Sequence, residues 1–275
     1  MRRFLVLAYG LLAYLLFVGT MAYAVAFFGN LFVSRTIDAA ATIPVGRALL
    51  VNLALLVVFA LQHSGMARPR CKHWLSRSVP AAAMRSTYVM MSCIAMILLM
   101  VLWQPMGGVV WSVDNEIARD AITLIYFLGW ILATWATFLL DHFELFGLRQ
   151  VWSEFRQRAP CREPGFRTPS AYRYLRHPIY AGWLVVLWAS PIMTVAHIVL
   201  AAGLTAYVFV GVRLEERDLE RRLPYYRQYR RKVPMLLPSW RRRLRSQEHS
   251  GAAGKPAPMT RTSAVPSAKA ADTRP

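Results

Sequence analysis

The stretch IYAGWLVVLWASPIMTVAHIVLAAGLTAYVFVGV, residues 179–212, decides the fold of this chain. It is about 34 residues long and almost wholly apolar, whereas one upright membrane-spanning helix needs about 20. The pair Ser190-Pro191 interrupts it, and a proline removes a backbone donor and disrupts a helix. We therefore predict a tight helical hairpin in a membrane. Its first arm is short, about 178–189, and its second arm, 195–212, continues as a polar helix over 213–223.

The composition as a whole is that of a membrane protein. Of the 275 residues, 56% are hydrophobic and the mean hydropathy is +0.33, too apolar for an ordinary soluble domain. Four further apolar runs have the length of a span: residues 4–33, 45–63, 80–103 and 118–140. The first is too long for a signal peptide and lacks a small-residue cleavage site, so we expect it to be retained. The predicted fold is all-α, a polytopic integral membrane helical bundle of four spans plus the C-terminal helical hairpin.

Basic residues alternate along the chain. The formal net charge is +19, from 33 Lys+Arg and 14 Asp+Glu. The N-terminus holds two of these cations, residues 66–87 hold five, 142–176 seven, and 213 onward sixteen, while 34–47 and 104–119 hold two and one. The positive-inside rule places the rich segments on the cytoplasmic side, with both termini. We attribute most of the charge to topology and to attraction for lipid headgroups, not to nucleic acid.

Other features exclude some classes of site. The three cysteines, Cys71, Cys93 and Cys161, lack the spacing of a zinc site or a disulfide framework, so we expect no metal. Residues 246–275 are rich in Ala, Pro, Ser and Thr without an apolar period, which predicts a disordered tail. We expect a single membrane domain over residues 1–245.

Polar residues cluster at the open end of the hairpin, on both of its arms. The stretch RYLRHPIYAGW, 173–183, puts Arg176, His177 and Pro178 at a helix N-terminus, which favours an anion such as a carboxylate or phosphate. Anchoring by positive charge accounts for Arg173 but not for the order Arg-His-Pro-x-Tyr. Gly182, one turn in, allows a close approach.

The second arm ends in GVRLEERDLE, residues 211–220. A tight hairpin would bring Arg213, Glu215 and Glu216 close to the basic end of the first arm. We expect Glu215 to be the carboxylate that faces inward, on a stripe with Val208 and Val212. Carboxylates accept paired hydroxyls such as those of a ribose. An exposed ion-pair helix, with the arginines that follow, is the alternative.

Two further groups follow earlier spans. In LQHSGMARP, 61–69, His63 either faces a site or belongs to a polar helix end. In LLDHFELFGLRQVW, 139–152, apolar and polar residues mix as in a helix that lies in the membrane interface. An interfacial helix does not explain Asp141 and His142, which lie at the edge of the hydrocarbon, so these two residues are candidates to line a site. Polar groups at membrane depth are costly and tend to be functional.

The hairpin thus offers cations that can bind a carboxylate and two glutamates that can accept hydrogen bonds from hydroxyls. It also offers aromatic surfaces at Tyr180, Trp183 and Tyr207. These groups suit a zwitterionic nucleoside, and an aromatic face tolerates a sulfonium cation.

At this point the motifs resemble a known family. RHPIYAG (176–182), LEERDL (214–219) and YYRQYRRKVPMLLP (225–238) resemble the isoprenylcysteine carboxyl methyltransferases, integral membrane enzymes that use S-adenosylmethionine. One departure is Leu223-Pro224, where the family commonly has Phe-Gly. A second set of segments is similar to the bacterial methanethiol S-methyltransferases, a branch related to the NnrU-like membrane proteins: GNLFVSRTID (29–38), FALQHSGMARP (59–69), RSTYVMMS (85–92), GVVW (108–111) and ATFLLDHFELFGLRQVW (136–152). That likeness covers about residues 15–240.

The resemblance implies methyl transfer from S-adenosylmethionine to methanethiol, giving dimethyl sulfide, in a bacterial inner membrane. It implies a cofactor-binding part over 172–240 that uses Tyr172, Arg176, His177, Pro178, Tyr180, Gly182, Glu215, Glu216 and Tyr226. It makes the closing segment a cytoplasmic lid, through Tyr226, Tyr229, Val233, Pro234 and Pro238. It places Asp141, His142 and Gln150 on the thiol side.

The chemistry needs a thiolate, because a neutral thiol is a poor nucleophile. We expect His63 or His142 to accept the thiol proton, or Arg176 or Arg213 to stabilise the thiolate, with Glu215 near the reaction centre. The sulfonium is already a good leaving group, so no metal is required.

Three alternatives stay open. The acceptor could be a larger thiol, a prenylated cysteine carboxylate or a phospholipid amine. The chain could be a non-catalytic NnrU-like protein tied to nitrogen-oxide metabolism. A small transporter fits less well, because no inverted repeat is visible. The sequence does not give the oligomeric state.

Overall fold

The computed structural model describes residues 1–158, 170–223 and 225–236. It confirms a polytopic helical membrane protein, and the predicted tail, 246–275, lies outside the described residues. Five helices are long and apolar enough to cross a membrane: α1 (Arg2–Phe28), α2 (Val45–Ala67), α4 (Met84–Leu102) with its leading 3-10 turn η1 (Ala81–Ala83), α5 (Glu116–Leu139) and α9 (Val195–Arg222). The first span ends five residues earlier than predicted, because the apolar residues after Phe28 belong to a connecting segment.

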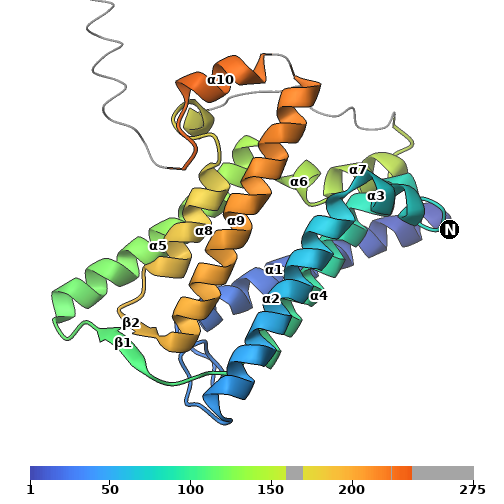
Figure 1. Cartoon of the computed structure of the whole chain (residues 1–275). Helices are drawn as coiled ribbons and strands as arrows, with labels where there is room; N and C mark the ends of the chain where they lie inside the picture. Colours follow the sequence, from blue (N-terminus) through green and yellow to red (C-terminus); the bar gives the residue numbers. More distant parts are fainter. Residues whose placement is uncertain (159–169, 224, 237–275) are drawn as a thin grey trace, which may run out of the picture. The chain divides into compact units, whose positions relative to one another are not determined.

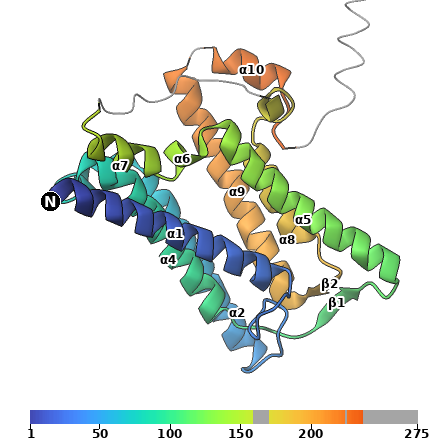
Figure 2. The same cartoon turned by 180° about the vertical axis from the view of Figure 1, so that it is seen from behind.

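The helices form two groups. α1, α2 and α4 pack side by side, α5 and α9 flank the short helix α8 (Pro178–Trp188), and α2 lies against α9 (Figures 1 and 2). α2, α5 and α9 all end at the same end of the bundle, because α4 and the short helix α8 run back between them (Figure 1). The short helices α3 (Pro69–Leu75), α6 (His142–Leu145), α7 (Leu148–Phe155) and α10 (Tyr226–Lys232) therefore gather at one end (Figure 1). The described parts of the basic segments share this end, as their alternation predicts.

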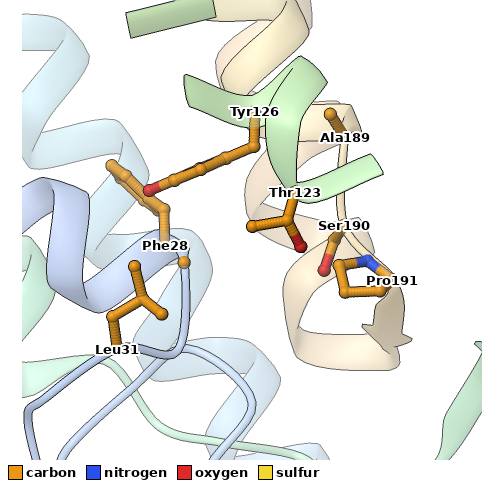
Figure 3. Close-up of a pocket in the computed structure, with 8 residues that line it drawn as sticks. Phe28, Leu31, Thr123, Tyr126, Ala189, Ser190 and Pro191 are labelled. Atoms are coloured by element: carbon orange, nitrogen blue, oxygen red, sulfur yellow. The ribbon is translucent and has the colours of Figure 1, made fainter. Parts of the chain in front are cut away.

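The opposite end is closed by a small sheet that the sequence did not indicate. Strands β1 (Val109–Ser112) and β2 (Ile192–Thr194) pair antiparallel (Figure 2). Nearby lies a small pocket without a charged side chain (Figure 3). Its lining residues are Phe28, Gly29, Leu31, Thr123, Tyr126, Ala189, Ser190 and Pro191.

The hairpin is present as predicted. Pro178 begins α8, whose 11 residues rise about 16 Å, too little to cross a hydrocarbon core of about 30 Å. The break falls at Ser190-Pro191, where the Trp111 indole donates a hydrogen bond to the Ser190 carbonyl at 3.2 Å. The second arm and its polar extension form one unbroken helix of 28 residues, α9.

α5 and α8 approach each other through small residues. A Cβ atom added to Gly182 would lie 2.7 Å from the Gly129 carbonyl oxygen and 2.7 Å from the Ala133 amide nitrogen. Such close approach of backbones is typical of membrane helix interfaces. The Trp130 and Trp183 rings, 5.0 Å apart, pack beside this contact. Helix packing therefore accounts for Gly182, which the motif had suggested as a cofactor residue.

Buried polar contacts around Asp38, which we call the Asp38 clasp, join the connecting segment 29–44 to α9 at the end opposite α10. They involve Asn30, Asp38, Thr194 and His197. The Asp38 carboxylate, only 6% exposed, lies 3.0 Å from His197 Nδ1. Asn30 Nδ2 donates to it at 2.6 Å, and the Thr194 hydroxyl donates to its other oxygen. Burial raises the pKa of Asp38, but the contacts with His197, together with the hydrogen bonds from Thr194 and Asn30, outweigh it and hold that pKa below its usual value.

We expect Gly182→Ala to destabilise the protein by about 1–3 kcal/mol, because the two nearest atoms that its methyl group would meet, each at 2.7 Å, belong to the α5 backbone. Thermal unfolding in detergent measures this. Gly19→Ala is the matched control, since a methyl group there meets no atom within 4 Å. Equal stability of the two variants would contradict the close α5–α8 packing.

The Asp38 clasp predicts a loss of stability in acid. A carboxyl group whose pKa is lower in the folded state stabilises the protein above its unfolded pKa of about 4, and this contribution is lost as pH falls through the folded pKa. The unfolding temperature should therefore fall below about pH 4 in the wild type. Asp38→Asn should be less stable at neutral pH and show a smaller acid-induced loss. A parallel decline in both proteins would contradict the assignment.

Candidate functional site

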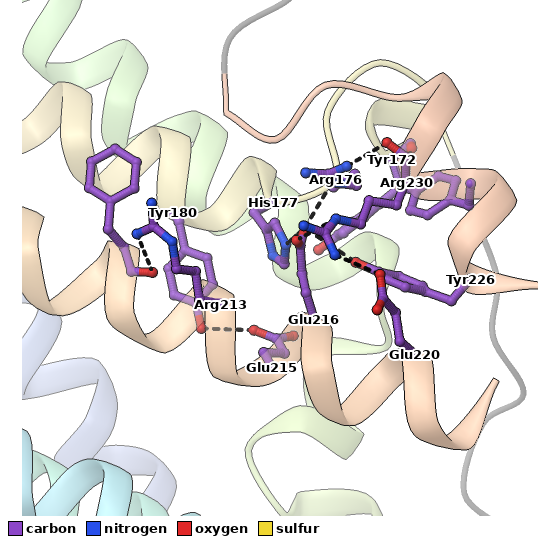
Figure 4. Close-up of polar contacts among 12 residues, drawn as sticks. Tyr172, Arg176, His177, Tyr180, Arg213, Glu215, Glu216, Glu220, Tyr226 and Arg230 are labelled. Atoms are coloured by element: carbon purple, nitrogen blue, oxygen red, sulfur yellow. Dashed lines mark hydrogen bonds and ion pairs between the residues drawn. The ribbon is translucent and has the colours of Figure 1, made fainter. Parts of the chain in front are cut away.

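The carboxylate of Glu216, on α9, lies at the centre of a cluster of cations (Figure 4). Glu216 is 3% exposed. Its Oε1 atom lies 2.8 Å from Arg176 Nε and 3.1 Å from His177 Nε2, while Oε2 lies 3.4 Å from Arg230 Nε. The Arg176 contact is a charge contact without a directed hydrogen bond. A buried carboxylate persists only when it is paired in this way.

The segment after α9 is held over the N-terminus of α8. The backbone amides of Arg176 and His177 donate to the carbonyls of Pro234 and Met235, at 3.0 and 3.2 Å. The Arg176 guanidinium also donates to the Arg230 carbonyl at 2.6 Å. The segment that the motif suggested as a lid therefore covers the cation cluster, as far as residue 236. Pro238 lies outside the described residues.

Buried phenols reinforce this cover. The Tyr229 hydroxyl donates to the Tyr172 carbonyl at 2.6 Å, and the Tyr226 hydroxyl donates to Glu216 at 3.5 Å. Burial raises the pKa of Tyr229 to about 12 and also raises the pKa of Tyr172 and Tyr226. The phenols therefore stay neutral at physiological pH, and the two hydroxyls remain donors.

The two carboxylates of the acidic pair take different roles from those predicted. Glu216 is the buried one, because Val208, Val212 and Glu216 follow each other at intervals of four on one face of α9. The prediction that Glu215 faces inward was wrong in this sense, since Glu215 is exposed. Its carboxylate accepts a hydrogen bond from the Tyr180 hydroxyl at 3.2 Å. Among the described residues it forms no ion pair, so it retains capacity to accept further hydrogen bonds.

A second polar cluster lies between the two helix groups. His63 Nε2, on α2, is 2.9 Å from the Tyr88 hydroxyl, and its Nδ1 is 3.1 Å from the Ser92 hydroxyl, both on α4. Ser64 and Tyr207 hydroxyls are 3.0 Å apart, and the His63 and Tyr207 rings meet at 6.3 Å. All five side chains are half-buried.

The two clusters are neighbours. The Ser64 hydroxyl, on α2, lies 3.0 Å from that of Tyr207 on α9, and Glu215, eight residues further along α9, accepts a hydrogen bond from Tyr180 on α8. Both clusters therefore border α9, about two turns apart. The structure brings His63 to the predicted cofactor side of the molecule.

His142 is placed elsewhere. Its Nε2 lies 2.9 Å from the Tyr14 hydroxyl and its Nδ1 2.7 Å from the Thr137 hydroxyl. Its ring stacks on Phe138 at 4.2 Å and contacts Phe146 at 4.7 Å. Burial lowers the pKa of His142, against the opposing charge of Asp141, so the ring is neutral. Both nitrogens are occupied in an aromatic box against α1.

The other residues predicted on the thiol side shape the chain around α6. Asp141 has a positive φ of 75°, caps α6 by accepting from the Glu144 amide, and pairs with Arg149. Gln150 Nε2 donates to the Glu144 carbonyl at 3.1 Å. Asp141 and Arg149 also edge an apolar groove lined by Leu7, Leu11, Phe143, Leu148 and Trp152.

Arg213 stays at the margin of the cluster (Figure 4). It is exposed, donates weakly to the Phe209 carbonyl at 3.5 Å, and lies 5.9 Å from the Phe209 ring. Three residues of the clusters were not predicted: Arg230, Tyr88 and Ser92. Within the described residues no group of three or more His, Cys, Asp or Glu is placed to bind a metal ion.

Comparison with known proteins places this architecture. The sequence profile of the NnrU protein family matches residues 51–245. The chain belongs to the NnrU protein family. It is 46% identical over 239 residues to a methanethiol S-methyltransferase of Mycobacterium tuberculosis, which covers 86% of this chain and 98% of that protein. It is 44% identical to one of Crocosphaera subtropica, covering 86% and 92%. No solved structure matches the chain.

A third relative extends the range of organisms. Methanethiol S-methyltransferase 1 of Bradyrhizobium diazoefficiens is 42% identical over 243 residues, covering 87% of this chain and 84% of that protein. The resemblance found in the motifs is therefore confirmed at the level of the family. The region matched by the NnrU profile contains every residue of the Glu216 and His63 clusters.

In this NnrU protein, Glu216→Gln should loosen the cover over α8. Removing the charge leaves Arg176 and Arg230 without their shared counter-ion, and breaking a buried pair typically costs about 3–5 kcal/mol. Hydrogen exchange of residues 225–236 should speed up markedly. Glu220→Gln is the control, since Glu220 pairs with Arg230 only at the more exposed edge and should change stability by less than about 1 kcal/mol. Unchanged exchange in Glu216→Gln would exclude this carboxylate as the anchor.

Proposed function

We propose that this NnrU protein methylates methanethiol with S-adenosylmethionine at a membrane-embedded site, giving dimethyl sulfide and S-adenosylhomocysteine. The observation that carries the proposal is that the ion cluster around Glu216, with Glu215 beside it, and the His63 cluster border the same helix, α9, about two turns apart. The family profile, residues 51–245, spans both clusters, and relatives named methanethiol S-methyltransferase are 46% and 44% identical over 239 residues. A donor and a thiol acceptor would each have a distinct, adjacent place.

The residues present fit S-adenosylmethionine. The Glu215 carboxylate has acceptor capacity to spare for a ribose diol or an ammonium group, and the Tyr180 ring beside it suits a sulfonium. The side chain of Arg230 is 48% exposed, so its guanidinium can bind the carboxylate of the cofactor from the solvent side. We assign the cofactor to these residues and to the wall formed by Tyr172, Arg176, His177, Pro178, Gly182, Glu216 and Tyr226. When bound, the cofactor supplies a methyl group on a sulfonium.

We assign the thiol to the His63 cluster. Half-buried hydroxyls and aromatic rings suit a small, weakly polar molecule that arrives through the bilayer. His63 accepts the proton, because its ring is half-buried, whereas the ring of His142 is only 6% exposed and is packed among phenylalanines. A site screened from water strengthens such proton transfer and orders the reacting groups.

The orientation follows from charge. We place the α10 end, which carries the basic segments, on the cytoplasmic side of a bacterial inner membrane, together with both termini. The cofactor would then enter from the cytoplasm. The membrane domain would extend over residues 1–245, with residues 172–240 as its cofactor-binding part.

The decisive test is a headspace assay. Purified protein with methyl-labelled S-adenosylmethionine and methanethiol should release labelled dimethyl sulfide. Glu215→Gln should raise the KM for the cofactor about 10-fold or more, through loss of a charge-assisted contact of 1.5–3 kcal/mol. Asp218→Asn, three residues along the same helix, is the control and should behave as wild type, because Asp218 pairs only with exposed parts of Arg68 and Arg221.

The same assay separates the alternatives. Cofactor binding without dimethyl sulfide would refute methanethiol as the acceptor, and a panel of larger thiols, prenylcysteine and phospholipid would then identify the class. Failure to bind the cofactor would refute the enzymatic role itself.

A further inference from the structure

The chain contains two triads of the same chemical make-up. In each, a histidine Nε2 atom lies 2.9 Å from a tyrosine hydroxyl, and Nδ1 faces the hydroxyl of a serine or threonine. One triad is Tyr88–His63–Ser92, with an Nδ1 distance of 3.1 Å. The other is Tyr14–His142–Thr137, with an Nδ1 distance of 2.7 Å. Because their geometry is alike, their surroundings decide what each can do.

The surroundings differ sharply. The His142 ring is enclosed by aromatic rings, those of Phe17, Phe138, Phe143 and Phe146. The His63 ring instead has hydroxyl-bearing neighbours, since the Tyr207 ring lies 6.3 Å from it and the Tyr207 hydroxyl is 3.0 Å from that of Ser64. Tyr88, His63 and Ser92 are all half-buried, whereas His142 is only 6% exposed. The first triad therefore keeps exposed surface to offer a ligand, and the histidine of the second keeps almost none.

We propose that Tyr88 contacts the acceptor thiol and passes its proton to His63, and that Ser92 is a positioning residue that fixes the tautomer of His63. This inference rests on the proposed function. Nε2 can accept from the Tyr88 hydroxyl only if the neutral ring carries its hydrogen on Nδ1. The Ser92 oxygen, on the Nδ1 side, is the acceptor that selects this tautomer.

The step balances in atoms and charge. The thiol gives its S–H proton to the Tyr88 oxygen while the Tyr88 hydroxyl proton moves to His63 Nε2. The thiol sulfur uses its electron pair to form the new C–S bond as the methyl group leaves the donor, whose bonding pair stays on the donor sulfur. The positive charge lost by the sulfonium reappears on the imidazolium. The site therefore keeps the same net charge in a medium where creating charge is costly. The imidazolium returns its proton to water after the product leaves.

Tyr88→Phe tests the relay through the reaction. It should lower kcat for methanethiol by about 10²-fold, the usual contribution of a proton-transfer group, and leave cofactor affinity unchanged. Tyr14→Phe removes the same hydrogen bond, at the same length, from the second triad and should keep wild-type activity. The loss in Tyr88→Phe should shrink with 2,2,2-trifluoroethanethiol, which is more acidic and therefore more ionised at the assay pH. An equal loss with both thiols would mean that Tyr88 serves packing alone.

The tautomer is tested without any substrate. In ligand-free protein labelled with 15N-histidine, the His63 signal, assigned from its absence in His63→Gln, should show the Nδ1–H tautomer. Ser92→Ala should shift it toward Nε2–H and lower kcat, Ser92→Thr should restore both, and Thr137→Val should leave the His63 signal in place. An Nε2–H signal in the wild type would overturn the proposal, since Nε2 could then not accept a proton.

The two hypotheses fail in different ways. If the wild type makes no dimethyl sulfide, the proposed function fails. If the wild type is active and Tyr88→Phe is equally active, only the relay through Tyr88 is refuted.

Discussion

The burial of one carboxylate, that of Glu216, constrains how α8, α9 and α10 are arranged. A carboxylate removed from water is too costly to keep unless cations from the rest of the chain reach it. Arg176 and His177 come from the start of α8, and Arg230 comes from α10. To bring these cations within about 3 Å of one carboxylate, the hairpin must be tight and the segment after it must fold back. The cover over α8 is therefore a consequence of this ion cluster as much as of its own backbone hydrogen bonds.

The sequence predicts those parts of the fold that depend on local composition. The apolar runs give the spans, Pro191 gives the hairpin, and the alternation of Lys and Arg gives the common end of the short helices. Composition does not define where a helix ends, because an apolar residue such as Phe32 can equally lie in a connecting segment. The choice between Glu215 and Glu216 depends on a rotation of one residue, about 100° on a helix. A stripe of apolar residues does not resolve that angle when two carboxylates are adjacent.

The parts of the site that the sequence did not predict depend on contacts between distant spans. The hydrogen bond between Tyr88 and His63 joins residues 25 apart, and that between Ser64 and Tyr207 joins residues 143 apart. The local sequence of an apolar run does not indicate which residue a tyrosine or serine within it will contact. For the same reason the sequence left His63 and His142 as equivalent candidates for the base. Only the packing of the helices shows that His63 is half-buried and His142 is buried among aromatic rings.

The cost of removing charge from water explains why the Glu216 cluster and the His63 cluster use different chemical groups. The cluster around Glu216 uses formal charges, and it lies at the end of the bundle where α10 and the basic segments gather. The cluster around His63 uses neutral hydroxyls and a histidine, and it lies between helices that are long and apolar enough to span a membrane. Formal charges become more expensive with distance from water, while hydrogen bonds between neutral groups do not. The charged cluster around Glu216 and the neutral hydrogen bonds around His63 are thus two results of the same desolvation cost.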